Sequence, residues 1–346
     1  MAVFNHTEFD QHEQVVFCSD KATGLKAIIA VHSTALGPAV GGCRLWDYAN
    51  DDDAIQDVLR LSKGMTYKNA LAGLPLGGGK SVIIGDAKQI KSEALFRAFG
   101  RFIHRLGGSY YSAEDVNITT GDIMMANKET PYVAGLEGKS GNPAPFTALG
   151  TYQGIRAAVK HKLGVDSLKD IKVSIQGLGS VGFYLCEHLH KEGAKLFVTD
   201  INAESVQRAV DKFGATAVGL DEIYAQDVDV YAPCALGATI NEDTIPQLNA
   251  KVVAGCANNQ LKKSRHGDML RERGILYAPD YVINAGGIIN VSMEMRAEGY
   301  NADDSTAKVN EIYHTLLNIF QRADEEQKST HLVADIMAQE IIAKGR

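Results

Sequence analysis

Apolar and polar positions alternate in two different ways along residues 148–278 of the chain. Short apolar runs are separated by longer stretches in which the apolar residues recur at helical spacing. This pattern predicts a series of helices over 148–162, 181–192 and 204–213, and of strands over 171–176, 195–200, 228–232, 251–255 and 275–278. Strands that are continuous apolar runs and alternate with helices predict a parallel sheet covered on both faces.

The first third of the chain lacks this regular alternation. Residues 25–31 predict a strand, and residues 53–65 and 92–106 predict amphipathic helices, the second capped by Ser92. Glycine and proline residues gather among polar residues over 135–145, which predicts a domain boundary. The last part of the chain is predicted to be helical. One helix carries an apolar stripe of Val309, Ile312, Tyr313, Leu316, Leu317 and Phe320, and the final helix carries Leu332, Ile336 and Ile341.

The composition is that of an ordinary globular protein. The 346 residues, 45% hydrophobic and 22% charged, are enough for two domains with their own cores. A net charge of −7 without any block of lysine and arginine argues against a nucleic-acid partner and a polybasic membrane anchor. No apolar run approaches the roughly 20 residues of a transmembrane helix. The five cysteines are far apart and never in C-x-x-C spacing, which is typical of free thiols in the cytoplasm.

A glycine-rich motif of the G-x-G-x-x-G type occupies residues 177–182, between a predicted strand and a predicted helix. In this setting Gly177 permits a tight turn, Gly179 allows backbone to approach a pyrophosphate, and Gly182 allows close helix–strand packing. The helix N-terminus, with Ser180 and Val181, offers N–H groups to phosphates. Asp200 ends the next predicted strand, where a carboxylate accepts from a ribose 2′-hydroxyl and repels a 2′-phosphate, so the motif favours NAD over NADP. The alternative is a glycine-rich turn without a ligand.

A second glycine-rich segment, GLPLGGGKS at 73–81, resembles a nucleoside-triphosphate loop but fails its spacing, and a strand pattern follows it instead of a helix. A glycine-rich turn separates Lys68 from Lys80, which would bring both ammonium groups into one pocket. Mutual repulsion and burial would then lower a lysine pKa and suit it to acid–base chemistry. The residues alone leave an alternative open, in which Lys68, Lys80 and Asp115 are solvated charges on the surface. No metal site is expected, because the histidines include no H-E-x-x-H pattern.

Several long segments, in order along the chain, resemble the Glu/Leu/Phe/Val amino-acid dehydrogenase family. They are GGCRLW (41–46), KGMTYKNA (63–70), GLPLGGGK (73–80), AEDV (113–116), GNPAPFTALG (141–150), CANNQL (256–261) and PDYVINAGG (279–287). The resemblance implies an α/β fold of two domains separated by a cleft. An N-terminal α/β substrate-binding and oligomerisation domain would span 1–134, with a C-terminal helix (328–346) packing back onto it. A doubly wound, Rossmann-type NAD-binding domain would span 145–327.

The resemblance also implies the reaction and the roles of individual residues. The reaction is NAD-dependent, reversible oxidative deamination of an L-amino acid to its 2-oxo acid and ammonia, with an alkaline optimum for deamination. Lys68 would pair with the substrate carboxylate, Lys80 would activate water through a lowered pKa, and Asp115 would shuttle the proton of the amino nitrogen. The remaining substrate residues would be Val40, Gly41, Gly42, Met65, Ala113, Asn284 and Val291. The remaining coenzyme residues would be Thr147, Cys234, Ala235, Ala257 and Asn258.

The side-chain pocket is expected to be apolar. Glutamate-specific relatives place a lysine just before the Gly-Gly pair, where this chain has Val40, so a buried acidic side chain would lack a partner. Ala113 and Val291 match the pair typical of branched-chain enzymes, which predicts leucine, valine and isoleucine as substrates. Phenylalanine or tryptophan oxidation by the same fold, and a non-catalytic NAD-binding sensor, are the alternatives. The resemblance further implies a homo-oligomer, with an octamer expected.

Overall fold

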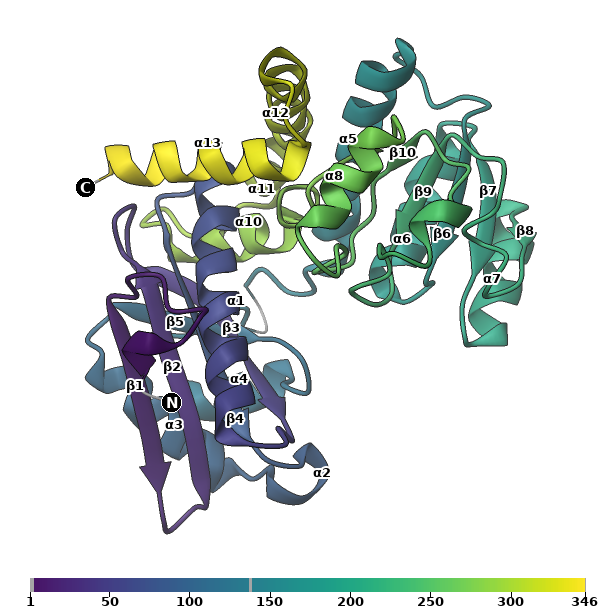
Figure 1. Cartoon of the computed structure of the whole chain (residues 1–346). Coiled ribbons are helices and arrows are strands. Elements are labelled where there is room, and N and C mark those ends of the chain that lie inside the picture. Colours follow the sequence, from purple (N-terminus) through teal and green to yellow (C-terminus); the bar gives the residue numbers. More distant parts are fainter. Residues whose placement is uncertain (1–2, 137–138, 346) are drawn as a thin grey trace. The chain divides into compact units, whose positions relative to one another are not determined.

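The computed structural model of the protein describes residues 3–136 and 139–345, so Gly138 of the predicted boundary lies outside the described residues. The chain folds as two units (Figure 1). Unit 1 comprises the described residues of Met1–Gly141, Val291–Tyr300 and Ala338–Arg346, and unit 2 comprises Asn142–Asn290 and Asn301–Met337. Val291–Tyr300 therefore belongs to unit 1, although it lies inside the range 145–327 expected for the second domain.

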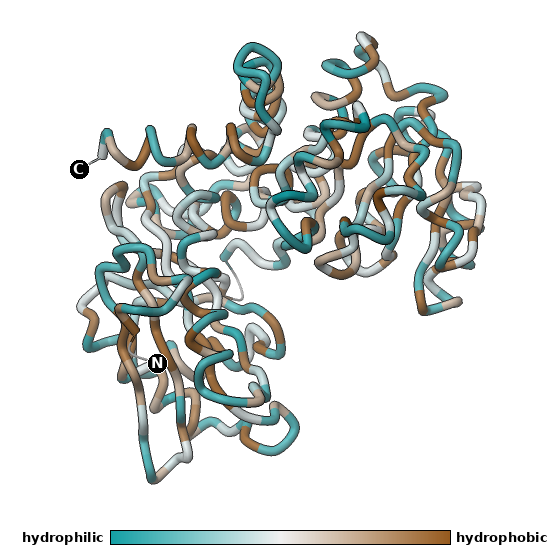
Figure 2. The backbone as a smooth tube through the Cα atoms, viewed as in Figure 1, coloured by the Kyte–Doolittle hydropathy of each residue, from teal (hydrophilic) through white to brown (hydrophobic). Residues whose placement is uncertain are grey.

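Unit 1 is built on a mixed sheet of five strands in the order β1-β2-β4-β3-β5. The strands β1 and β2 form an antiparallel hairpin, β4 is antiparallel to β2, and β3 runs parallel to both β4 and β5. Hydrophobic stretches of the chain follow these strands, whereas the β1–β2 turn is hydrophilic (Figure 2). The five strands are β1 (Gln14–Asp20), β2 (Leu25–Ser33), β3 (Ala39–Trp46), β4 (Gly77–Ile84) and β5 (Tyr110–Glu114).

Helices cover both faces of this sheet. Along β2, the side chains on one face of the sheet pack in an apolar core with α3, and these are Leu25, Ala27, Ile29 and Val31. Ile28 and Ala30 lie on the other face and pack in a second core with α1. This two-residue period is what a strand buried on both faces requires. The predicted N-cap is confirmed, because the Ser92 hydroxyl accepts from the backbone N–H of Leu95 at 3.2 Å. The helices of unit 1 are α1 (Asp51–Leu71), α2 (Ala87–Ile90), α3 (Glu93–Arg105) and α4 (Thr120–Asn127), with 3-10 turns η1 (Val3–Asn5) and η3 (Met293–Met295).

Unit 2 confirms the predicted parallel sheet. Its six strands pair in the order β11-β10-β9-β6-β7-β8, and every pairing is parallel. Every residue of β9 is buried, as expected for a strand covered on both faces. The strands are β6 (Lys172–Gln176), β7 (Lys195–Thr199), β8 (Thr216–Ala217), β9 (Val230–Pro233), β10 (Val252–Val253) and β11 (Leu276–Tyr277).

The helices of unit 2 begin with α5, which is longer than predicted because Pro145 fits the first helical turn and lets it start at Ala144. They are α5 (Ala144–Leu163), α6 (Ser180–Lys191), α7 (Ala203–Phe213), α8 (Arg265–Glu272), α9 (Asp280–Ile283), α11 (Ala302–Asn310) and α12 (Ile312–Glu326), with the 3-10 turn η2 (Ile245–Gln247). Two further helices, α10 (Gly286–Ser292) and α13 (Thr330–Lys344), contain residues of both units. No helix in the described parts of the chain has the length and hydropathy needed to cross a membrane.

Two predictions for the C-terminal helices were wrong in detail. The stripe expected on one helix is divided between α11 and α12, which break at Glu311. In α13, Leu332 is 38% exposed, and the fully buried side chains are Val333, Ala334 and Ala338. Alanine is small enough to let a helix approach its neighbours closely, so a stripe chosen by residue size pointed to the wrong face.

Two histidines, His12 and His32, are buried together between α1 and the sheet. Their rings meet edge to face with centroids 4.8 Å apart. His12 Nε2 lies 3.0 Å from the Leu59 carbonyl oxygen, and His32 Nδ1 lies 2.8 Å from Thr66 Oγ1. Burial lowers the pKa of both side chains, to about 4 for His32, where the proximity of His12 contributes as well.

The histidine pair predicts a loss of stability in mild acid. The unfolded chain takes up a proton at the His32 side chain near pH 6.5, whereas the folded chain does so only near pH 4. Stability is therefore fully present above pH 6.5 and falls as the pH drops toward 4, by as much as about 3 kcal/mol. Urea unfolding at pH 8, 6.5 and 5 measures this loss. His32→Gln should flatten the pH dependence, and an unchanged slope in that variant would contradict the assignment.

Candidate functional site

The catalytic pair predicted from the sequence, Lys80 and Asp115, meets in unit 1. Lys80 belongs to β4 and is 7% exposed, and Asp115 directly follows β5. The Lys80 Nζ atom lies 2.6 Å from Asp115 Oδ2. Burial by itself would raise the pKa of Asp115, but the charges of Lys80 and Arg44 outweigh it and hold the pKa of this carboxyl below its usual value. The carboxylate is therefore ionised at neutral pH and can accept a proton directly from the Lys80 ammonium group.

Two glycines of β3 make this contact possible. Strand β3 lies between β4 and β5, and Cys43 pairs with Ser81 on one side and Glu114 on the other. The preceding residue, Gly42, thus lies between Lys80 and Ala113. A Cβ on Gly42 would lie 2.9 Å from the Cβ of Asp115, and a Cβ on Gly41 would lie 1.8 Å from the Gly79 carbonyl oxygen. A side chain at either position would push the strands or the carboxylate apart.

The three glycines before Lys80 belong to β4 itself, which corrects the expectation of a glycine-rich turn between Lys68 and Lys80. Lys68 lies in the last turn of α1, and this helix packs against β4. A Cβ on Gly78 would lie 2.0 Å from the Thr66 backbone nitrogen, so glycine is what lets the helix approach the strand so closely. This approach brings the end of α1, with Met65 and Lys68, over the strand that carries Lys80.

The remaining predicted substrate residues of unit 1 are apolar and mostly hidden. Val40 is fully buried, and Ala113 and Val291 are nearly so. The Met65 side chain lies close to Gly41, where a Cβ would come within 3.2 Å of its Cγ.

Arg44 stands inside the GGCRLW motif, but the motif by itself did not indicate a role for this residue. Its Nε atom lies 3.5 Å from Asp115 Oδ2, and its Nη1 atom donates to Asp57 Oδ2 at 2.9 Å. The Tyr48 hydroxyl donates to the same Asp57 oxygen at 2.6 Å. Arg44 therefore holds Asp115 against α1 and adds to the positive charge around it. A second missed residue, the fully buried Tyr110, donates from its hydroxyl to the Gly41 carbonyl oxygen at 2.8 Å.

The glycine-rich loop of unit 2 follows β6 and opens α6, as predicted. Gly177 has φ +108°, a value that side-chain-bearing residues rarely adopt, and a Cβ there would lie 2.7 Å from the Cβ of Ala235. A Cβ on Gly182 would lie 2.1 Å from the Gly177 carbonyl oxygen. Gly179, by contrast, faces open space, and Ser180 beside it is exposed. The loop thus leaves backbone at the helix N-terminus accessible, which fits a dinucleotide pyrophosphate.

Asp200 follows β7 and lies against this loop. Its Oδ2 atom accepts from the Leu178 backbone N–H at 2.6 Å, and its Oδ1 atom accepts from the Asn202 N–H at 2.8 Å. Each carboxylate oxygen has a further lone pair, so these bonds leave acceptor capacity for a ribose hydroxyl.

The loops after β9 and β10 carry the other predicted coenzyme residues of unit 2. Asn284 joins the loop after β10 to α9, because its Nδ2 atom donates to the Cys256 carbonyl oxygen at 3.1 Å and to Asn258 Oδ1 at 2.7 Å. Thr147 lies in the first turn of α5 and packs against Gly287, where a Cβ would be 2.8 Å from the Thr147 hydroxyl.

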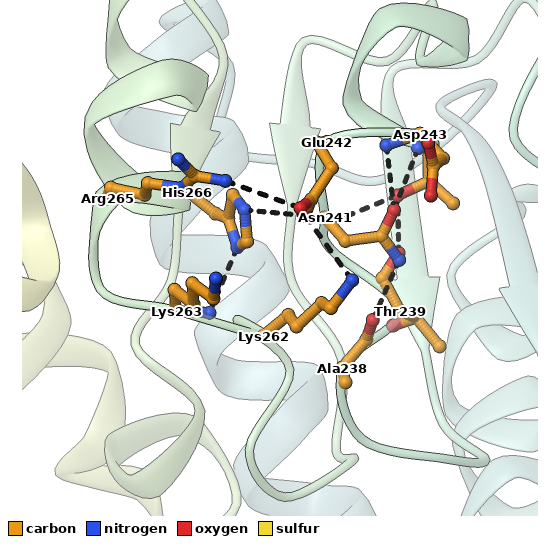
Figure 3. Close-up of polar contacts among 10 residues, drawn as sticks. Ala238, Thr239, Asn241, Glu242, Asp243, Lys262, Lys263, Arg265 and His266 are labelled. Atoms are coloured by element: carbon orange, nitrogen blue, oxygen red, sulfur yellow. Dashed lines mark hydrogen bonds and ion pairs between the residues drawn. The ribbon is translucent and has the colours of Figure 1, made fainter.

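A polar network fastens these two loops together farther along the chain (Figure 3). Glu242, from the loop after β9, lies 3.1 Å from His266 Nε2, 3.3 Å from Arg265 Nη2 and 3.5 Å from Lys262 Nζ, all beyond β10. A hydrogen bond from its own backbone N–H, together with these positive charges, lowers the pKa of Glu242 to about 2. On the other side, the Asn241 side chain donates to the Ala238 carbonyl oxygen at 2.9 Å (Figure 3). The network therefore fixes the backbone next to the predicted coenzyme residues.

The class of protein follows from these two units: unit 2 is a Rossmann-type dinucleotide-binding fold, and unit 1 adds an ion-paired lysine and carboxylate beside an apolar surface. The family models of the Glu/Leu/Phe/Val dehydrogenase dimerisation domain and of Glutamate/Leucine/Phenylalanine/Valine dehydrogenase match residues 12–136 and 198–345. The chain belongs to this family of NAD(P)-dependent amino-acid dehydrogenases.

Individual relatives are similar over nearly the whole chain. Leucine dehydrogenase of Bacillus subtilis (strain 168) is 56% identical over 349 residues, which cover 100% of this chain and 95% of the relative. Valine dehydrogenase of Streptomyces virginiae is 48% identical over 99% of this chain and 96% of the relative. The crystal structure of L-tryptophan dehydrogenase from Nostoc punctiforme superimposes with a TM-score of 0.87 at 47% identity, covering 96% of each chain.

Proposed function

We propose that the protein catalyses the NAD-dependent, reversible oxidative deamination of L-leucine and other branched-chain L-amino acids to 2-oxo acids and ammonia. The observation that carries the proposal is the ion pair between the buried Lys80 and the partly buried Asp115, set beside the small, apolar Ala113. A protein that only senses NAD has no use for such a proton-transfer pair. Val40 stands where a carboxylate-binding lysine would be needed for glutamate.

In this proposal the residues of unit 1 bind the amino acid and move its protons. The ammonium group of Lys68 pairs with the substrate α-carboxylate, and Val40, Ala113 and Val291 surround the side chain. Asp115 is ionised and accepts a proton from the substrate amino group. Lys80 then acts as a base toward a water molecule that attacks the imino acid carbon, and the contact with Asp115 carries the proton between the two groups.

The glycine-rich loop and Asp200 of unit 2 hold the dinucleotide, with the pyrophosphate at the N-terminus of α6 and the adenine ribose at the carboxylate. When bound, NAD would supply the acceptor for the hydride that leaves the substrate Cα. Thr147 would bind the carboxamide, and Cys234, Ala235, Ala257 and Asn258 would line the nicotinamide ribose. We further propose that the chain assembles through unit 1 as a homo-oligomer, with an octamer as the state that light scattering should find.

The test is NADH formation at alkaline pH with leucine, valine, isoleucine, phenylalanine, tryptophan and glutamate, each with NAD and with NADP. We expect turnover with the three branched-chain amino acids and NAD, with modest discrimination because one methylene is worth only about 1–3 kcal/mol. A preference for phenylalanine or tryptophan would agree with the proposed deamination but would contradict the proposed branched-chain side-chain pocket. Measurable NADH binding without turnover of any amino acid would overturn the enzyme and favour a sensor.

The coenzyme preference is predicted to depend on Asp200. Asp200→Ala removes a charged acceptor, so we expect NADH affinity to fall by about ten- to a hundredfold. The ratio of NAD to NADP turnover should fall as well, because the repulsion of a 2′-phosphate is lost. Asp221→Ala is the control, because it removes the same charge from an exposed position of unit 2. Unchanged NAD-to-NADP discrimination in the Asp200 variant would contradict the assignment.

A further inference from the structure

Three cysteines gather in unit 2, and the proposed reaction uses no thiol. Cys186 lies in α6, Cys234 directly follows β9, and Cys256 lies shortly after β10; all three are free thiols. Cys186 is fully buried and Cys256 is 9% exposed, whereas Cys234 is half-buried. Cys234 is thus the most accessible of the three.

Cys234 and Cys256 lie on neighbouring segments of the chain, just beyond the ends of the adjacent parallel strands β9 and β10. Tyr231 of β9 pairs with Val253 of β10, and beyond these paired residues the Ala257 N–H donates to the Pro233 carbonyl oxygen at 3.0 Å, so the two segments stay side by side. Adjacent strands are about 4.8 Å apart, and disulfides form at Cα separations of about 4.4–6.8 Å. The Cys256 Sγ donates to the Cys234 carbonyl oxygen at 4.0 Å, so the Cys256 thiol lies against the backbone of Cys234. The pair can therefore be joined without a large movement of the backbone.

The two thiols differ in reactivity. The hydrogen bond from Cys256 lowers the pKa of Cys234 despite burial, whereas the same bond and burial raise the pKa of Cys256. The thiolate, which is the nucleophile, therefore forms first at Cys234. Elsewhere in the chain, burial raises the pKa of Cys18 and Cys43 to about 12, so neither is a competing nucleophile near neutral pH.

We propose that Cys234 and Cys256 form a redox modification site, at which a hydroperoxide such as hydrogen peroxide closes a reversible disulfide. The Cys234 thiolate attacks one peroxide oxygen, the O–O bond breaks, and hydroxide leaves, giving a sulfenic acid. The Cys256 sulfur then attacks the Cys234 sulfur, the S–O bond breaks, and the departing oxygen takes the Cys256 proton and leaves as water. Two thiols lose two electrons in all, and one hydrogen peroxide is reduced to two waters.

The disulfide would act on the proposed coenzyme site, and this part of the inference rests on the proposed function. The residue after Cys234, Ala235, is the one that a Cβ on Gly177 would strike, so the loop after β9 lies directly against the glycine-rich loop. On the other side, the Cys256 carbonyl oxygen holds Asn284. Joining the two sulfurs in a covalent bond would move both the loop after β9 and the loop after β10. Because these loops carry the proposed coenzyme residues, dinucleotide binding would weaken.

The experiment uses the full-length protein, reduced and then freed of reductant. Half of each sample is treated with a small excess of hydrogen peroxide, and both halves are digested after alkylation for mass spectrometry of the 234–256 linkage. NADH binding is measured on the same samples by fluorescence, before and after dithiothreitol. Cys256→Ser removes the resolving thiol, and Cys186→Ser is the matched control from the same cluster. Each variant is compared with its own reduced form.

We expect the wild type and Cys186→Ser to form the linkage, with the dissociation constant for NADH rising about tenfold and recovering in dithiothreitol. Cys256→Ser should form no linkage and keep its affinity after brief treatment. A Cys186–Cys234 linkage, or overoxidation of Cys234 without any linkage, would overturn the assignment. A 234–256 linkage with unchanged NADH affinity would overturn the effect on the coenzyme. Failure of the reduced protein to bind NADH would count against the proposed function alone, because the linkage is measured independently.

Discussion

Replacing Lys80 by alanine should lower the rate of leucine deamination by about 10³-fold or more, because a positioned acid–base group contributes about 10²–10⁴ to a rate. The change removes the base proposed to activate water and leaves Asp115 with Arg44 as its remaining charged neighbour. NADH binding should persist, because the glycine-rich loop belongs to unit 2. Initial rates of NADH formation, with fluorescence titration of NADH, measure the two effects separately.

Two controls separate proton transfer from charge. Lys80→Arg keeps a positive charge beside Asp115 but cannot lose its proton near working pH, so its rate should be as low as that of the alanine variant. Lys88→Ala removes an exposed lysine in α2 and should leave the rate unchanged. If Lys80→Arg kept most of the activity, Lys80 would serve as a fixed charge and the proposed base would be wrong.

Adding one methyl group at Gly182 should disrupt unit 2. A Cβ there would lie 2.1 Å from the Gly177 carbonyl oxygen, so α6 must move away from the loop. We expect Gly182→Ala to destabilise the protein by about 1–3 kcal/mol, the usual cost of overpacking, and to abolish measurable NADH binding. Thermal unfolding and NADH titration measure the two losses.

Gly179→Ala tests coenzyme binding separately from packing and is compared with Gly182→Ala. A Cβ at this position meets nothing within 4 Å, so thermal stability should stay close to that of the wild type. If the loop binds a pyrophosphate, the methyl group occupies the space that the dinucleotide needs, and NADH affinity should fall although the fold is intact. Wild-type affinity in Gly179→Ala would contradict the binding mode. A stable Gly182→Ala would contradict the packing argument.

The sequence alone determined the parallel sheet of unit 2 and its glycine-rich loop. These features depend on local patterns, namely apolar runs of strand length, helical spacing between them, and glycines at fixed offsets, and each pattern reflects backbone geometry within a few residues. The Ser92 cap was predictable for the same reason, because its hydrogen bond closes within three residues.

Other features depend on contacts between distant segments, and only the tertiary structure decided them. The three glycines before Lys80 lie in a strand instead of a turn, and Ser33, Thr66 of α1 and Tyr110 lie so close to them that no side chain would fit, which no local pattern records. The same holds for Arg44, whose role arises from its position between Asp57 and Asp115, and for the buried face of α13. The proposed site follows this division. Family motifs named its residues, but the 2.6 Å contact between Lys80 and Asp115 exists because two glycines on the intervening strand leave room for it.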